Sequence, residues 1–240
     1  MLANETIIQL AARIQTSEEN IRREYFQHLF LSRLYKQEDT GKVYFKGGTA
    51  LHLIYGDPRF SEDLDFDTEI RSIRTIEDMV IATLAAFEQE GINTNLHEAK
   101  TTSGGYFSVV EFRAEGRTVP IQLELSLREG KKKEGSAAVV NSEFFPIYNV
   151  VQLSHELLIQ GKLHALLERH KPRDYYDFYF LLRANLLPEK KRAVFEQVLT
   201  LLQKEEANFN EELRRFLPKG HHIIIRDFKS TLEREIKRYL

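Results

Sequence analysis

Three aspartates occupy every second position of the segment Asp63-Leu-Asp-Phe-Asp67. On a β-strand, successive side chains point to opposite faces, so these three carboxylates would share one face and Leu64 and Phe66 the other. Carboxylates gathered in this way repel one another unless a cation neutralises them. A divalent cation such as Mg²⁺ suits them, because it prefers oxygen ligands. Asp63 and Asp65 are therefore candidate metal ligands, although a solvated strand with several acids would show the same spacing.

A pair of glycines precedes these acids, in the segment Phe45-Lys-Gly-Gly-Thr49. Glycines let backbone N–H groups approach an anion closely, and the N-terminus of a following helix adds partial positive charge. Gly47 and Gly48, with the hydroxyl of Thr49, are thus predicted to bind phosphate, whereas a glycine pair alone would indicate an ordinary turn. Thr49 and Asp63 are 14 residues apart. A phosphate loop followed by an acid pair supplies both halves of a nucleoside triphosphate site.

A further acid is needed where two metal ions are held about 4 Å apart. The best candidate is Glu124, in the segment Ile121-Gln-Leu-Glu-Leu-Ser-Leu127. The apolar residues of this segment alternate with polar ones, which predicts a strand with one buried face. Glu124 would lie on the polar face with Gln122 and Ser126. A solvated acid in the middle of a strand remains the alternative.

A second dense patch begins at Lys162 and is rich in charged and aromatic residues. Lys162 and Arg169 are seven residues apart and so share a helix face. Asp174 and Asp177 are spaced i,i+3, and Arg173 and Asp177 are spaced i,i+4. Capping of a helix together with a surface ion pair, worth under about 1 kcal/mol, would explain these spacings. Opposite a metal site, Lys162 would instead be a natural partner for triphosphate oxygens.

The elements that position these residues follow from the periodicity of apolar residues. The first forty residues predict two helices, with a helix start at Thr16 or Ser17. The region up to residue 150 then predicts the following: strand Val43–Lys46, helix Thr49–Tyr55, strand Asp63–Thr68, helix Ile76–Gln89, strands Asn93–Lys100, Tyr106–Ala114 and Thr118–Arg128, an exposed loop Glu129–Ser136, and a short run Ala137–Tyr148.

The remainder of the chain is helical in pattern. Tyr175, Tyr176 and Tyr179 could stack on nucleic-acid bases, but their helical spacing favours packing in a core. The predicted helices are Ser154–Glu168, Arg173–Ala184, Glu189–Lys204, Glu211–Phe216 and Ile223–Tyr239. We therefore predict an α+β fold: a mixed sheet with flanking helices, and then a C-terminal helical bundle. The domains would be 1–150, which includes the N-terminal helices, and 151–240.

Composition and charge exclude several classes of protein. The 240 residues include no cysteine, which rules out disulfides and thiolate–metal sites. The N-terminus lacks the pattern of a signal peptide, and no run approaches the roughly 18 apolar residues of a membrane span. We therefore expect a cytoplasmic protein with no membrane partner. Residues 1–150 carry 17 Lys and Arg against 23 Asp and Glu, and residues 151–240 carry 17 against 13. The mildly basic C-terminal part would suit a phosphate-rich partner, although a solvated helical surface has the same composition.

Two blocks of this sequence resemble a known family. GGTAL followed by R-x-S-x-DLDF, and then K-x2-AL-x2-R-x2-PRD-x2-D, are similar to motifs of the AbiEii/AbiGii nucleotidyltransferase toxins. These are the toxins of type IV toxin–antitoxin (abortive infection) systems, within the polymerase-β-like nucleotidyltransferase superfamily. The resemblance therefore implies that the mixed sheet is nucleotidyltransferase-like. The resemblance covers roughly residues 40–185, and the ordered pair of blocks is its most specific feature.

The resemblance implies a role for several positions. Gly47, Gly48 and Thr49 match the phosphate-binding loop, and Ser61 matches a serine that lines the nucleotide site. Asp63 and Asp65 match the metal-binding pair. Lys162 matches the lysine that contacts the nucleotide, and Asp174 matches an acid of the last motif, beside Arg173 and Asp177. Glu124 has no motif around it and is the least supported of the metal ligands. The predicted catalytic residues are thus Asp63, Asp65, Lys162 and Asp174.

The resemblance also implies the reaction and the partners. It predicts a transferase that uses Mg²⁺ or Mn²⁺ to move a nucleoside monophosphate from an NTP to a hydroxyl at the 3′ end of tRNA, with release of pyrophosphate. A cognate antitoxin is implied, without required contact. Three alternatives stay open: a nucleotidyl- or phosphotransferase that acts on a small-molecule or protein acceptor, a catalytically silent nucleotide-binding module, and a structural interaction protein. The last would leave the combined glycine pair and acid pair unexplained.

Overall fold

The computed structural model describes residues 1–127 and 134–240. Contacts between Cα atoms divide the chain into two compact units. The N-terminal unit comprises residues 1–56 and 60–154, and the C-terminal unit comprises residues 57–59 and 155–240. The short segment Asp57–Arg59 thus belongs to the C-terminal unit, although it lies in the sequence between two elements of the N-terminal one. Whether residues 1–150 and 151–240 form separate domains stays a prediction.

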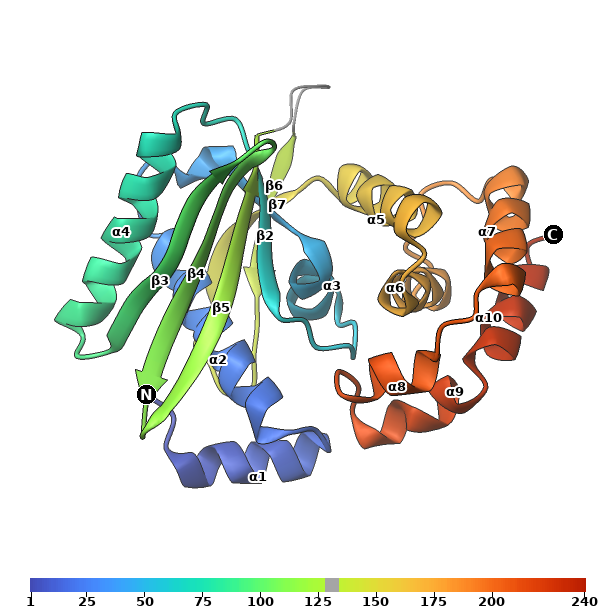
Figure 1. Cartoon of the computed structure of the whole chain (residues 1–240), viewed down its shortest axis with the longest axis horizontal. Helices are drawn as coiled ribbons and strands as arrows, with labels where there is room; N and C mark the ends of the chain where they lie inside the picture. Colours follow the sequence, from blue (N-terminus) through green and yellow to red (C-terminus); the bar gives the residue numbers. More distant parts are fainter. Residues whose placement is uncertain (128–133) are drawn as a thin grey trace. The chain divides into compact units, whose positions relative to one another are not determined.

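Among the described residues, the N-terminal unit is built on a seven-stranded mixed sheet with the order β3-β4-β5-β2-β1-β7-β6 (Figure 1). Strand β2 pairs parallel with β5 and antiparallel with β1. It therefore lies inside the sheet, between β1, which leads into the glycine pair, and β5, which carries Glu124. The strands are β1 (Val43–Lys46), β2 (Asp63–Thr68), β3 (Asn93–Thr102), β4 (Gly105–Ala114), β5 (Arg117–Ser126), β6 (Gly135–Val140) and β7 (Tyr148–Leu153).

Helices α2 (Glu18–Leu34) and α4 (Ile73–Gln89) cover the apolar face of this sheet (Figure 1). Phe112 of β4 stacks on Phe26 of α2, with ring centroids 4.6 Å apart, and meets Phe87 of α4 at 5.4 Å. The strand register places Phe112 on the same face as Leu64 and Phe66. Because side chains alternate along a strand, the aspartates of β2 lie on the opposite face. Helix α1 (Asn4–Ile14) precedes α2, and the 3-10 turn η1 (Thr40–Lys42) precedes β1.

Helix α3 (Gly47–Tyr55) follows β1 directly and packs against β1 and β2. It begins two residues before the predicted start at Thr49, because the two glycines form its first turn and do not precede it. Strand β7 was not predicted, because the short run Ala137–Tyr148 ended where this strand begins. Strand β7 lies next to the edge of the sheet and pairs with both β1 and β6, so it is recognisable mainly by its partners.

The predicted loop Glu129–Ser136 and the predicted helix Ile223–Tyr239 differ in part from the structure. Residues 129–133 of the predicted loop Glu129–Ser136, and Arg128 of the predicted strand before it, lie outside the described residues. Gly135 and Ser136, at the end of that loop, belong to β6. The predicted helix Ile223–Tyr239 is two helices, α9 (His222–Arg226) and α10 (Phe228–Lys237), which are separated at Asp227 by a non-helical backbone with ψ near 56°. The periodicity continues across this break and does not reveal it.

Helices form the C-terminal unit, and its core is aromatic. Tyr176 stacks on Phe228, and Phe228 also contacts Phe209 at a centroid distance of 5.1 Å. Tyr175 and Tyr176 are fully buried, which confirms their predicted packing role. Every helix within the described ranges is too short or too polar to cross a membrane. The other elements are α5 (His155–Arg169), α6 (Pro172–Arg183), α7 (Arg192–Lys204), α8 (Phe209–Arg214) and the 3-10 turn η2 (Lys219–His221).

Candidate active site

The aspartates of β2 share one face of the sheet, as the sequence predicted. Burial alternates along the strand, with Leu64 and Phe66 inside and the three aspartates partly exposed. The parallel register with β5 places Asp65 directly opposite Glu124. Side chains at such paired positions are near neighbours on one face. The structure therefore brings the acid pair and the predicted third acid to one place on the sheet.

Lys46 is the cation of this acidic face that the sequence analysis did not assign. It ends β1 opposite Asp65 in the antiparallel register. Its ammonium group lies 2.6 Å from Asp67 Oδ1 and 3.3 Å from Ser126 Oγ. Lys46 thus neutralises Asp67, the third aspartate of the strand. Its position directly before the glycine pair was visible in the sequence, but its partner depends on the pairing of β1 with β2.

The glycine pair lies against the acid pair. Gly47 has a positive φ of 87°, and a Cβ atom built on it would lie 2.0 Å from Asp65 Oδ2. No side chain fits there without displacing the carboxylate, so glycine is required for two independent reasons. Helix α3 starts at this point, and the first N–H groups of a helix have no partner within the helix. The N-terminus of α3, where phosphate binding is predicted, therefore lies beside the Asp65 carboxylate.

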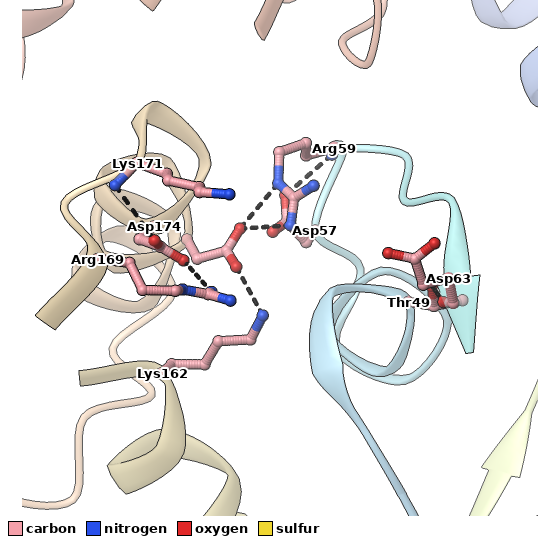
Figure 2. Close-up of polar contacts among 9 residues, drawn as sticks. Thr49, Asp57, Arg59, Asp63, Lys162, Arg169, Lys171 and Asp174 are labelled. Carbon is pink, nitrogen blue, oxygen red and sulfur yellow. Dashed lines mark hydrogen bonds and ion pairs between the residues drawn. The ribbon is translucent and has the colours of Figure 1, made fainter. Parts of the chain in front are cut away.

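The hydroxyl of Thr49 has a structural role in this geometry. Thr49 is fully buried, and its hydroxyl donates a hydrogen bond to the backbone carbonyl of Asp63 (Figure 2). This bond fixes the first turn of α3 to the start of β2. A phosphate at the loop would consequently be held by backbone N–H groups and not by this hydroxyl. Nucleotide binding by Thr49 stays a prediction, and it would be made through the backbone N–H of this residue.

Two buried side chains of α2 anchor these elements, and the sequence analysis assigned neither. The Gln27 amide donates to the carbonyl groups of Ser61 and Glu62, at 3.0 and 3.2 Å, directly before β2. Glu24 lies 3.2 Å from His52 Nε2 of α3. Burial would raise the pKa of Glu24, but hydrogen bonds from His28 and His52 outweigh it and lower this pKa to about 2. Polar residues within the apolar run of this helix were the available signal.

The donor set of the acidic face fits a hard divalent cation. Asp65 and Glu124 offer carboxylate oxygens from adjacent strands, and such cations prefer oxygen ligands. Within residues 1–127 and 134–240, no three His, Cys, Asp or Glu side chains are already gathered as a metal cage. The metal ligands Asp63, Asp65 and Glu124 stay predictions, and so does the nucleotide role of Ser61. Ser61 is partly exposed.

In the C-terminal unit, Lys162 belongs to a buried cluster of ions. Its ammonium group lies 2.7 Å from Asp177 Oδ2 (Figure 2). The guanidinium of Arg59 binds the other oxygen of Asp177 through Nε at 2.8 Å and Nη2 at 2.7 Å. Burial would raise the pKa of Asp177, but the charges of Arg59 and Lys162 outweigh it and hold this pKa below its usual value. The surface ion pair expected between Asp177 and Arg173 is wrong, because Asp177 is buried and both of its oxygens bind other partners.

Asp174 caps helix α6. Its Oδ2 accepts a hydrogen bond from the backbone N–H of Lys171 at 3.3 Å, and its Oδ1 lies 2.6 Å from Arg169 Nη2 (Figure 2). Both contacts stabilise the first turn of α6, as the capping alternative predicted. The catalytic role of Asp174 stays a prediction. Lys162 and Arg169 do share one face of α5, since each meets an acid of α6.

Known proteins share both the sequence pattern and the fold of this chain. A family model described as "Nucleotidyl transferase AbiEii toxin, Type IV TA system" matches residues 29–237. Comparison with curated proteins gives no match. Among solved structures, MenT4, the nucleotidyltransferase toxin Rv2826c from Mycobacterium tuberculosis H37Rv, is similar with a TM-score of 0.64 and 14% identity, over 100% of this chain and 90% of that one. JHP933 from Helicobacter pylori is similar with a TM-score of 0.60 and 20% identity, over 93% of each chain. At these identities the structural likeness shows the fold alone, and it confirms the predicted fold class.

Proposed function

Because the chain belongs to the AbiEii nucleotidyl transferase toxin family of type IV toxin–antitoxin systems, we propose that it transfers a nucleoside monophosphate from an NTP to the 3′ end of tRNA in a Mg²⁺-dependent reaction. The observation that carries this proposal is the approach of Gly47 to Asp65. A Cβ atom on Gly47 would meet Asp65 Oδ2 at 2.0 Å. The predicted phosphate loop and a predicted metal ligand are therefore close neighbours, which supports the binding of a metal–triphosphate there.

Six of the predicted residues have a defined task in this reaction. Asp63, Asp65 and Glu124 would hold Mg²⁺ or Mn²⁺, which supplies Lewis-acid stabilisation of the phosphate charge when bound. The backbone N–H groups at Gly47 and Gly48 hold the outgoing phosphates.

The chemical step is the attack of the acceptor hydroxyl on the α-phosphorus of the NTP. Lys162 neutralises charge on the triphosphate, and an acidic residue accepts the proton of the acceptor hydroxyl. The hydroxyl oxygen forms a bond to the α-phosphorus, the bond from that phosphorus to the β-phosphate oxygen breaks, and pyrophosphate leaves. Positioning and electrostatic stabilisation account for most of the catalysis in such a step.

A basic stretch in the C-terminal unit supports RNA as the acceptor. Residues 214–226 contain four Lys and Arg and no acid. All four basic side chains are exposed. The apolar residue Ile223, in the same stretch, is 73% exposed. A run of exposed cations with no acid between them suits the phosphate backbone of a nucleic acid. We propose that this stretch, formed by the end of α8, η2 and α9, binds the acceptor RNA. Its basic residues are Arg214, Arg215, Lys219 and Arg226.

Reversing charge on this stretch should weaken transfer to RNA selectively. We expect Lys219→Glu combined with Arg226→Glu to raise the KM for RNA by about tenfold and to make transfer less sensitive to salt. The KM for the NTP should stay unchanged. The matched control is Lys190→Glu with Lys191→Glu, which makes the same change of net charge at exposed positions of the same unit. Equal losses in both double variants would indicate a general charge effect and would remove the support for this surface.

The direct test of the proposed function is transfer of label from NTPs labelled at the α-phosphorus. Each of the four NTPs is incubated separately with total cellular RNA, with Mg²⁺ or with EDTA, and the products are separated as RNA, protein and small molecules. We expect label at the 3′ end of tRNA from one or a few NTPs, only with the metal, and none from the Asp65→Asn variant. Label in protein or small molecules would instead show a different acceptor. NTP binding without any transfer would show a silent nucleotide-binding module.

The family also implies a cellular setting for this activity. We propose a cognate antitoxin that counteracts the toxin, without a requirement for contact between the two. NTP and tRNA occur together in the cytoplasm, where we place the reaction. Co-expression with the antitoxin should therefore restore growth, whether or not the two proteins co-purify.

A further inference from the structure

The environment of Lys162 differs from that of an ordinary surface lysine. Its side chain is 13% exposed, and Asp177 beside it is 2% exposed. A lysine carries a flexible four-carbon chain and a strongly hydrated charge, so an isolated one samples many rotamers. Here one of its three N–H donors is bound to a carboxylate that is itself held in place. The ammonium group is therefore fixed before any substrate arrives.

Arg59 holds the carboxylate that fixes Lys162. The guanidinium binds Asp177 Oδ1 through two of its N–H groups, which leaves Oδ2 directed at Lys162. Arginine has a rigid planar fork, so two bonds to one carboxylate also fix the orientation of that carboxylate. The backbone N–H of Arg59 donates in turn a hydrogen bond to Asp57 Oδ1 at 2.9 Å. This bond forms an Asx-type turn, which fixes the backbone from which the arginine side chain starts. The result is a chain of contacts from Asp57 through Arg59 and Asp177 to Lys162.

Exposure differs within this cluster, and the difference argues against a purely structural role. Asp57 and Asp177 balance Arg59 and Lys162, so the four side chains have no net charge. Well-packed apolar residues would stabilise the same place at least as well as such buried ion pairs. Asp57, Arg59 and Asp177 are buried, whereas Lys162 is 13% exposed. Lys162 is therefore the most accessible charge of the four, and an ammonium group held in this way has a use where a phosphate binds.

We propose that Arg59 and Asp177 are positioning residues, which hold Lys162 in the orientation that binds the triphosphate. This inference rests on the proposed function, in which Lys162 neutralises the triphosphate. Asp177 takes one N–H donor of Lys162 and leaves two for phosphate oxygens. Neither Arg59 nor Asp177 needs to touch the substrate. Arg59 belongs to the R-x-S-x-DLDF block, so a sequence block that also carries the acid pair contributes the group that orients the lysine.

A double-mutant cycle tests whether Asp177 acts through Lys162. Lys162→Met, Asp177→Asn and the double variant are compared for KM and kcat with Mg²⁺ and ATP, GTP, CTP or UTP, and for inhibition by inorganic tripolyphosphate. Two residues that act as one unit have non-additive effects. We expect each single variant to raise the KM for the NTP by about tenfold, which corresponds to the loss of one charge-assisted contact. The double variant should be no worse than Lys162→Met, within about twofold.

Arg59→Lys and Arg169→Met complete the design. Arg59→Lys keeps the charge and loses the fork, so we expect a KM about threefold higher, and no further rise when Lys162→Met is also present. Arg169 makes the other ion pair between α5 and α6, with Asp174, and its side chain is 47% exposed. Arg169→Met should therefore lower the midpoint of urea unfolding and leave the KM for the NTP unchanged. Arg59→Lys also carries the test if Asp177→Asn does not fold.

The outcomes separate this inference from the proposed function. Additive effects, with the KM of the double variant raised by about a hundredfold, would overturn the positioning role and leave Lys162 as a nucleotide ligand. A rise in KM for Arg169→Met equal to that for Asp177→Asn would also overturn it, because the cause would then be general loosening of the helix pair. If Lys162→Met changes neither NTP affinity nor tripolyphosphate inhibition, the proposed role of Lys162 itself fails.

Discussion

Asp65→Asn should abolish nucleotide transfer and leave the protein at least as stable as the wild type. The substitution keeps the shape of the side chain and removes its charge, so a divalent cation loses a carboxylate ligand. Metal ions supply several kcal/mol of charge stabilisation in such transition states, and a loss of about 4 kcal/mol corresponds to a rate reduced on the order of 1,000-fold. Steady-state transfer with Mg²⁺ and the preferred NTP measures this loss.

The stability of the same variant is the more diagnostic result. Asp65 lies directly opposite Glu124 in the parallel register. Like charges at paired strand positions destabilise a sheet, by roughly 0.2–1 kcal/mol. Removing one of them should therefore raise the free energy of unfolding in metal-free buffer by a few tenths of a kcal/mol, a difference that urea denaturation with EDTA measures. A residue that raises activity and lowers stability is typical of an active site.

Asp67→Asn is the matched control, with the opposite expected pattern. Asp67 is on the same face of the same strand, but its carboxylate is bound to Lys46 at 2.6 Å. Losing this partly buried pair should lower the free energy of unfolding by about 1 kcal/mol. Transfer should fall by less than about tenfold. If Asp67→Asn loses as much activity as Asp65→Asn, the division of roles between these two aspartates is incorrect.

Gly47→Ala should also have a large effect, on both activity and stability. A non-glycine residue in the left-handed region costs roughly 1–2 kcal/mol. The added methyl group would in addition lie 2.0 Å from Asp65 Oδ2, so the loop or the carboxylate must move. A displacement of about 1 Å in a catalytic group can cost about a hundredfold in rate. We expect at least this loss of transfer, together with a destabilisation of roughly 2–3 kcal/mol in urea unfolding.

Gly56→Ala separates the two causes. Gly56 ends the same helix with a similar positive φ of 77°, but a Cβ atom there would meet nothing within 4 Å. It should show the backbone strain, about 1 kcal/mol, and keep its activity within about twofold. Equal losses of activity in both alanine variants would show that backbone strain alone disturbs α3, and that contact between the loop and Asp65 is not needed for transfer.

The acidic strand and the class of chemistry could be predicted from local sequence patterns. Alternation of acids with Leu64 and Phe66 is a local property, because the side chains of a strand alternate whatever the strand pairs with. The ordered glycine and acid blocks indicated the family, which the match over residues 29–237 confirms. The helical C-terminal part was predicted for the same reason, since periodicity is carried by neighbouring residues. Boundaries were less well predicted where a helix changed direction at Asp227 without losing its pattern.

Which charges form pairs depends on how distant segments of the chain fold together. Asp67 could have been a metal ligand on spacing alone, and it is the pairing of β1 with β2 that gives it to Lys46. Thr49 carries a hydroxyl suited to phosphate, yet the hydroxyl lies on the Asp63 carbonyl. Arg59 and Asp177 are 118 positions apart, and no periodicity connects them. The physical reason is the range of the interaction: backbone geometry fixes the direction of a side chain from its neighbours, whereas an ion pair depends on folding distant segments together.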